Sequence, residues 1–89
     1  MELTEIKINP QFDVCKGMEI RKNELQEMKR QIQDTILNIN EYAFMAHYAR
    51  KLDDMKSAHL YEYKLKELKE SLRDTIRLNK EYYIIKIEV

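Results

Sequence analysis

Two segments of this chain repeat one pattern, in which apolar residues recur at steps of three and four. Residues 25–42 read LQEMKRQIQDTILNINEY, and residues 65–82 read LKELKESLRDTIRLNKEY. Eight of the 18 aligned positions are identical at an offset of 40 residues. Because apolar residues with this spacing lie along one face of an α-helix, the pattern predicts two long amphipathic helices.

The similarity between the two segments continues into the residues that precede them. Residues 12–17, FDVCKG, align with residues 52–57, LDDMKS, at the same offset. We interpret residues 12–42 and 52–82 as an internal duplication of a connector followed by a helix. The alternative is that amphipathic helices built from few residue types resemble one another without a duplication.

Both ends of the chain show the apolar–polar alternation of a half-buried β-strand. In residues 2–8 the members of one face would be Thr4, Ile6 and Ile8. Pro10 follows, and this strand should end before it because proline lacks the backbone donor that a sheet requires. In residues 83–89 the members of one face would be Tyr83, Ile85, Ile87 and Val89. Isoleucine and tyrosine both favour strands, which supports a second strand here.

The chain holds only one glycine and one proline, so long regular elements must be joined by few connections. We predict helices over residues 18–52 and 57–82, joined by a connector in which Asp54 and Ser57 are candidate helix caps. Two long helices with a short link form an antiparallel hairpin, which brings the terminal strands to the same end. The predicted fold is one mainly α domain, residues 1–89, with the order β-α-α-β.

The first helix has an apolar surface that is wider than one partner helix can cover. Between Tyr42 and Ala49 only His47 is polar, and a helix that is apolar on all sides is buried on all sides. An alternative breaks the helix near Asn38–Asn40, where asparagine would cap a new helix of different phase. We favour a continuous helix and expect a second copy of the chain to supply the missing layer, giving a homodimeric four-helix bundle.

Two sets of residues follow from this predicted hairpin. The helix–helix core should place Leu65, Leu68, Leu72 and Ile76 against Ile32, Ile36, Ile39 and Met45. The predicted interface residues are Tyr42, Phe44, Met45, Tyr48, Leu52, Ile85 and Ile87. The last two belong to the second strand, whose free edge would attract a strand of another molecule.

Candidate residues for ligand binding form weaker patterns. His59 and Glu62 have the i, i+3 spacing of metal ligands, and His47 would lie about one turn away, but di-metal bundles require Glu-x-x-His on two helices and two more glutamates. We therefore predict no metal and no cofactor. A basic stripe on the second helix and the six tyrosines suggest phosphate or nucleotide contacts instead. The candidate contacts are Lys66, Lys69, Arg73, Arg77 and Tyr63.

Charge and cysteine content narrow the classes of function. Sixteen acidic and 16 basic residues balance, which argues against a nucleic-acid binder. No apolar run approaches the length of a membrane span, and nothing resembles a signal peptide. Cys15 is the only cysteine, so the chain has no internal disulfide, which fits the cytoplasm.

Motifs that would indicate an enzyme are missing from the sequence. There is no phosphate-binding loop and no nucleophile motif, so we do not expect catalysis. The sequence predicts a small self-associating helical interaction protein (an adaptor, regulator or inhibitor) that binds itself and another protein. The alternatives are a small-ligand or nucleotide-binding oligomer with sites between subunits, and a weak nucleic-acid binder.

Overall fold

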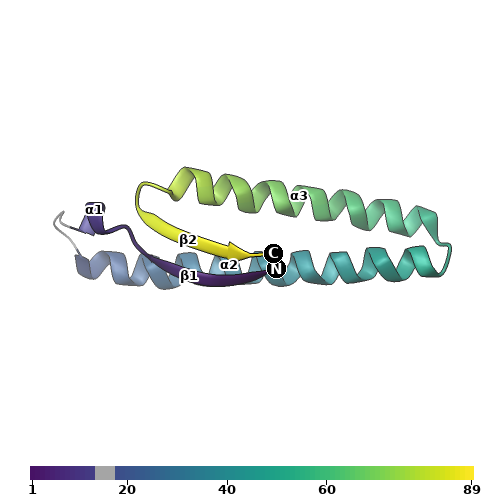
Figure 1. Cartoon of the computed structure of the whole chain (residues 1–89), viewed down its shortest axis with the longest axis horizontal. Coiled ribbons are helices and arrows are strands. Elements are labelled where there is room, and N and C mark those ends of the chain that lie inside the picture. Colours follow the sequence, from purple (N-terminus) through teal and green to yellow (C-terminus); the bar gives the residue numbers. More distant parts are fainter. Residues whose placement is uncertain (14–17) are drawn as a thin grey trace.

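The chain forms a long helical hairpin whose two ends pair as a short sheet (Figure 1). The computed structural model describes residues 1–13 and 18–89. Its elements in chain order are β1 (Glu2–Ile8), α1 (Pro10–Asp13), α2 (Met18–Lys51), α3 (Met55–Asn79) and β2 (Tyr83–Glu88). The predicted mainly α fold with the order β-α-α-β is confirmed, with the four-residue helix α1 as an addition.

Helices α2 and α3 meet along a seam of residues that recur at alternating steps of three and four. In α2 the buried and half-buried members are Met28, Ile32, Thr35, Ile39, Tyr42, Ala46 and Ala49. In α3 they are Ala58, Tyr61, Leu65, Leu68, Leu72, Thr75 and Asn79. This heptad spacing keeps one face of each helix against its partner along the hairpin.

The core lies in the half of the hairpin next to the sheet. Its buried members are Ile32, Ile36, Ile39 and Leu72. The half-buried residues packed against them are Met1, Leu3, Ile6, Met28, Leu65, Leu68, Ile76, Ile85 and Ile87. The predicted contact between the two helices is therefore confirmed, whereas Met45 is half-buried outside this cluster. Toward the tip the buried residues are Ala46, Ala49 and Ala58, which fill little volume.

The turn between α2 and α3 forms without a glycine. Asp53 adopts the left-handed region with φ of 57°, which is uncommon for other residues but tolerated by aspartate. The Asp53 N–H donates to the Arg50 carbonyl (3.1 Å) and the Asp54 N–H to the Ala49 carbonyl (2.9 Å), so the last carbonyls of α2 are satisfied. Asp54 caps α3 because its Oδ1 accepts from the Ser57 N–H (3.2 Å). This cap starts α3 two residues before the predicted position.

The Asp-Thr-Ile triplet of the repeated segments has the same local geometry in both helices. The Thr35 hydroxyl donates to the Gln31 carbonyl and the Thr75 hydroxyl to the Ser71 carbonyl, each at 2.9 Å. These bonds satisfy the hydroxyl groups, which otherwise compete with the helix backbone. Both threonines line one groove between the helices, so the triplets meet across the seam. The duplication itself stays a prediction.

Strands β1 and β2 are antiparallel, and a bulge in β1 changes which side chains face the helices. The apolar pairs in register are Leu3 with Ile87 and Ile6 with Ile85. The register shifts at Thr4, and this extra residue points outward, where its hydroxyl donates to the Lys86 carbonyl (3.0 Å). The predicted face was therefore wrong at Thr4, and Leu3 takes its place against the core.

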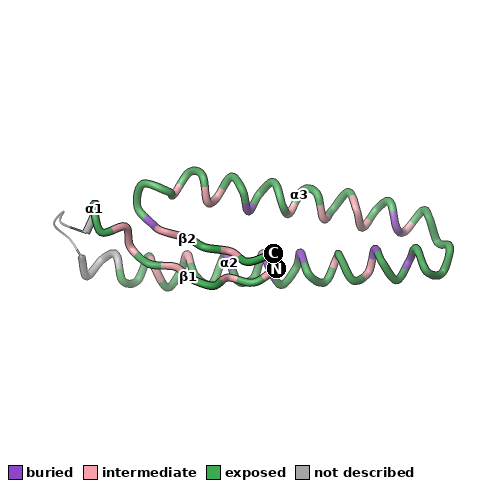
Figure 2. Tube along the Cα trace, in the orientation of Figure 1, coloured by how far each residue is buried: buried purple, intermediate pink, exposed green. Residues whose placement is uncertain are grey.

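The sheet covers only half of the hairpin. In Figure 1 both termini lie near the middle of the hairpin, beside α2. The Met1 amino group donates to Asn40 Oδ1 (3.4 Å) and the Asn40 amide donates to the Met1 carbonyl (3.0 Å), which fixes the start of β1 on this turn of α2. Val89, predicted to share the strand face, lies beyond β2 and is fully exposed. From Asn40 to the tip, the described part of the chain supplies no third layer (Figure 2).

Candidate functional site

Exposed apolar side chains lie on the side of α2 that faces away from α3, most of them in the uncovered half of the hairpin. We call Leu37, Phe44, Tyr48 and Leu52 the outer stripe; their exposed fractions are 57%, 69%, 56% and 62%. At 100° per residue they lie within about 80° of one another and roughly opposite the seam. One copy of the chain therefore presents to water an apolar surface that none of its described elements covers.

Phe44 and Tyr48 form a flat aromatic platform at the centre of the outer stripe. Their ring centroids are 6.4 Å apart, and the ring planes differ by 7°. The two residues are one helical turn apart, which is the spacing at which side chains on a helix surface meet. The platform combines a large apolar area with one hydroxyl group, a combination that is favoured at protein interfaces.

The other predicted interface residues face inward. The Tyr42 ring lies 6.1 Å from the Tyr61 ring across the seam, with an angle of 51° between them. Met45 is half-buried, and Ile85 and Ile87 pack against the core. The exposed members of the predicted set are Phe44, Tyr48 and Leu52.

Sequence reasoning missed the exposed apolar residues Leu37, Met55 and Leu60. Leu37 precedes Phe44 by seven residues, so the heptad spacing could have revealed it. Met55, which is 41% exposed, begins α3 directly after the turn. Leu60 and Tyr63 are 66% and 64% exposed on α3, and therefore belong to a different surface from the outer stripe.

Two charged residues interrupt the outer stripe. Glu41 and Lys51 are both exposed and lie about 40° to either side of the direction of Leu37, so Glu41 falls within the stripe and Lys51 at its edge. Each is five residues from residue 46, the midpoint between Phe44 and Tyr48. Neither takes part in the ion pairs found among the described residues.

An ion pair between the helices holds the tip together. The Arg50 guanidinium of α2 binds the Glu62 carboxylate of α3. The hydrogen bond from Arg50 holds the pKa of Glu62 below its ordinary value, and the same bond raises the pKa of Arg50. The Glu62 carboxylate, which has metal-ligand spacing from His59 in the sequence, is thus engaged by Arg50. In the part of the chain that the structure describes, no group of three or more His, Cys, Asp or Glu residues is arranged to hold a metal ion.

The predicted phosphate contacts only partly converge. One shallow hollow on α3 is lined by Glu62, Leu65, Lys66, Lys69, Glu70 and Arg73. Its three cations are partly offset by its two carboxylates. Arg77 lies at a different hollow and pairs with Asp74 (3.3 Å), and Tyr63 lines neither of the two.

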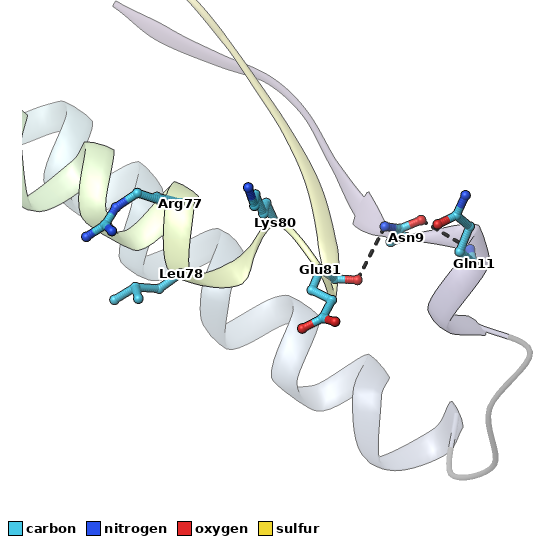
Figure 3. Close-up of a pocket in the computed structure, with 6 residues that line it drawn as sticks. All are labelled: Asn9, Gln11, Arg77, Leu78, Lys80 and Glu81. Carbon is cyan, nitrogen blue, oxygen red and sulfur yellow. Dashed lines mark hydrogen bonds between the residues drawn. The ribbon is translucent and has the colours of Figure 1, made fainter.

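The other hollow lies at the open end of the hairpin, where α3 turns into β2 (Figure 3). The Asn9 amide donates to the Glu81 carbonyl (3.3 Å), and the Asn9 side-chain oxygen accepts from the Gln11 N–H (3.1 Å), which caps α1. Figure 3 shows Arg77 and Leu78 directed away from Asn9, so the polar groups do not converge on one point. We interpret this region as a structural contact that holds the residue after β1 against the residues that follow α3.

No family model, curated protein or solved structure matches this chain. Among the helices that the structure describes, none is both long enough and apolar enough to cross a membrane. The outer stripe is the most exposed apolar surface on α2.

Proposed function

We propose that the protein is a small, non-enzymatic interaction module that binds itself and another protein through the uncovered half of its hairpin. The observation that carries this proposal is the exposure of the stacked pair Phe44 and Tyr48 on the side of α2 that faces away from the seam. Single apolar residues on a surface are ordinary, but several of them on one side of a helix are typical of a surface that a partner covers.

The composition of the seam at the tip supports the same proposal. Ala46, Ala49 and Ala58 bury little apolar area, so the two helices contribute little mutual stabilisation there. Stable domains are built from packed layers around a shared core, and in this half of the hairpin the described residues form a single helix pair. A partner that covers the outer stripe would supply the missing layer.

We assign different roles to the two exposed surfaces near the tip. The outer stripe mediates self-association, and Leu60 and Tyr63 on α3 remain accessible to another protein, as an adaptor or regulator requires. We place this module in the cytoplasm, because the single Cys15 leaves no internal disulfide.

Self-association is tested by the mass of the purified protein, measured by light scattering in the micromolar range. We expect at least twice the chain mass of 10.9 kDa. Phe44→Glu should return the mass to that of one chain, because a charge buried without a partner is strongly unfavourable. Leu78→Glu is the matched control, since Leu78 is also 69% exposed but lies at the open end of α3, and its mass should equal that of the wild type.

Circular dichroism separates lost association from lost folding in these variants. Both substitutions are at exposed helix positions, so helicity should be retained in each. A wild-type chain that stays monomeric throughout the micromolar range contradicts the proposal, as does equal dissociation of both variants.

A second candidate function is the binding of a phosphate-bearing small ligand. It is favoured by the gathering of Lys66, Lys69 and Arg73 in one hollow. Titration with inorganic phosphate should then shift the nuclear magnetic resonance signals of these three residues and leave those of Arg77 unchanged. Small, equal shifts at all basic residues would instead indicate screening by a general anion and would contradict this candidate.

A further inference from the structure

We propose that two copies of the chain pair their outer stripes in antiparallel orientation about a two-fold axis at residue 46. Residues whose numbers sum to 92 then lie opposite each other. This inference rests on the self-association proposed above, and it specifies the partner, the orientation and the register. A two-fold pair of this kind uses the same surface on both copies and closes on itself.

At its centre the register places aromatic residues against aromatic residues, whereas Leu52 lies opposite Asn40 of the partner subunit. Phe44 lies opposite Tyr48 of the partner subunit, so the two aromatic platforms meet at the axis. Two neighbouring registers keep the same helix faces together, and in them the paired residue numbers sum to 85 or 99 instead of 92. The first places Phe44 opposite Glu41, and the second places Tyr48 opposite Lys51.

The two charges that interrupt the outer stripe become complementary in this arrangement. Because Glu41 and Lys51 are each five residues from the axis, Glu41 faces Lys51 of the partner subunit, and two such pairs flank the platforms. Both residues are exposed and lack an ion pair among the described residues, so each charge is available for an ion pair with the partner subunit. A parallel pair in register would instead bring like charges together, which is repulsive. The charge pattern thus selects the antiparallel orientation.

The exposed area is that of a small contact. The four side chains of the outer stripe are 56–69% exposed, so each has roughly 100 Å² left to bury. Two copies together would therefore bury on the order of 800 Å². Stable interfaces usually exceed about 1,000–1,200 Å², so we expect a weak dimer that forms at high micromolar concentration and dissociates on dilution.

The outer stripe and the seam lie on opposite sides of α2, which fixes the shape of the pair. The four helices form a row in which the two copies of α2 are in the middle and the two copies of α3 are outside. This row differs from the closed four-helix bundle expected from the sequence, and the copies overlap only at their tips.

The orientation and register are tested with single-cysteine variants of the full chain. Glu41→Cys and Lys51→Cys are each made in a Cys15→Ser background, and mild oxidation of their mixture should give a covalent heterodimer. Each variant alone should stay uncross-linked, because its two cysteines would be ten residues apart along the pair, about 15 Å, beyond the reach of a disulfide. Leu78→Cys in the same background measures cross-linking by random collision.

The outcomes separate this inference from the proposed function. A mixed cross-link far above the Leu78→Cys background supports the antiparallel pair. Cross-linking of Glu41→Cys with itself, or a particle of dimer mass without the mixed cross-link, overturns the orientation or register while self-association stands. A particle of chain mass for the wild type refutes the self-association on which the inference rests.

Charge reversal gives a second test that requires no cysteine. Glu41→Lys and Lys51→Glu should each raise the dimer dissociation constant roughly tenfold, because each reversal creates two like-charge contacts. The double variant should restore the wild-type constant, since it exchanges the charges and keeps the pairs. Additive weakening in the double variant contradicts the pairing of Glu41 with Lys51.

Discussion

Truncation of Leu72 gives a quantitative test of the helix–helix core. Leu72 is 5% exposed and belongs to the buried cluster of Ile32, Ile36 and Ile39. Replacing a buried leucine by alanine removes apolar contacts and leaves a cavity, which costs about 2–5 kcal/mol. We expect about 2–3 kcal/mol for Leu72→Ala, because half-buried Leu68 can move toward the gap. For a domain of this length that loss lowers the thermal midpoint by roughly 10–20 °C.

The assay is urea unfolding followed by circular dichroism, with every variant at the same protein concentration because association adds to apparent stability. Leu78→Ala is the matched control: it makes the same chemical change on the same helix at a residue that is 69% exposed. This control should lose less than about 0.5 kcal/mol. A loss below that value for Leu72→Ala, or equal losses for the two variants, would show that the seam has been assigned to the wrong face of α3.

Three further predictions concern the cap, the pH dependence and the sheet. Asp54→Ala should cost about 0.5–2 kcal/mol in the same urea experiment, because α3 loses the carboxylate that accepts from the Ser57 N–H. Asp54→Ser should retain most of the stability, because serine can also cap a helix. Equal losses for the two variants would show that capping is not the cause. Acid should destabilise the protein, because hydrogen bonds from Ser57 and Arg50 hold the pKa values of Asp54 and Glu62 below their ordinary 3.8 and 4.5. A depressed folded-state pKa contributes stability above the unfolded-state value and loses it as the pH falls through the folded-state value, so the thermal midpoint should be level above about pH 5 and fall below about pH 4. A midpoint that rises on acidification contradicts this assignment. In β2, backbone amides that bond to β1 should be protected from hydrogen exchange, and exchange at the rate of a free peptide would show that the strands do not pair.

The helical hairpin could be predicted because its signal is long and regular. Steps of three and four along the repeated segments determine the buried face, and Ile32, Ile36, Ile39 and Leu72 all lie on it. The bulge at Thr4 could not be predicted, because the apolar–polar alternation of a sequence does not show where a strand contains one extra residue. The left-handed turn residue Asp53 was hidden for a similar reason, since glycine is the usual signal for that conformation.

The candidate surface was only partly predictable from the sequence. The excess of apolar residues after Tyr42 indicated that something must cover this segment, and Phe44, Tyr48 and Leu52 are indeed exposed in one copy. The sequence did not show which residues the hairpin itself would bury, because the inward positions at the tip are small alanines rather than large residues. Leu37 escaped notice because polar residues separate it from the others along the chain, although it shares their side of the helix.

The length of the assembled particle is the most direct test of the claim that the outer stripes pair at the tips. One copy is 56 Å long, and the proposed axis at residue 46 lies about 12 Å from the tip at 1.5 Å per residue. Twice the length of one copy, less the overlap, is roughly 85–90 Å. Small-angle X-ray scattering, at a concentration where light scattering gives twice the chain mass, should return a maximum dimension near that value. A particle of twice the chain mass that is little longer than the 56 Å of one copy would mean that the hairpins pack along their full length, and it would contradict pairing at the tips.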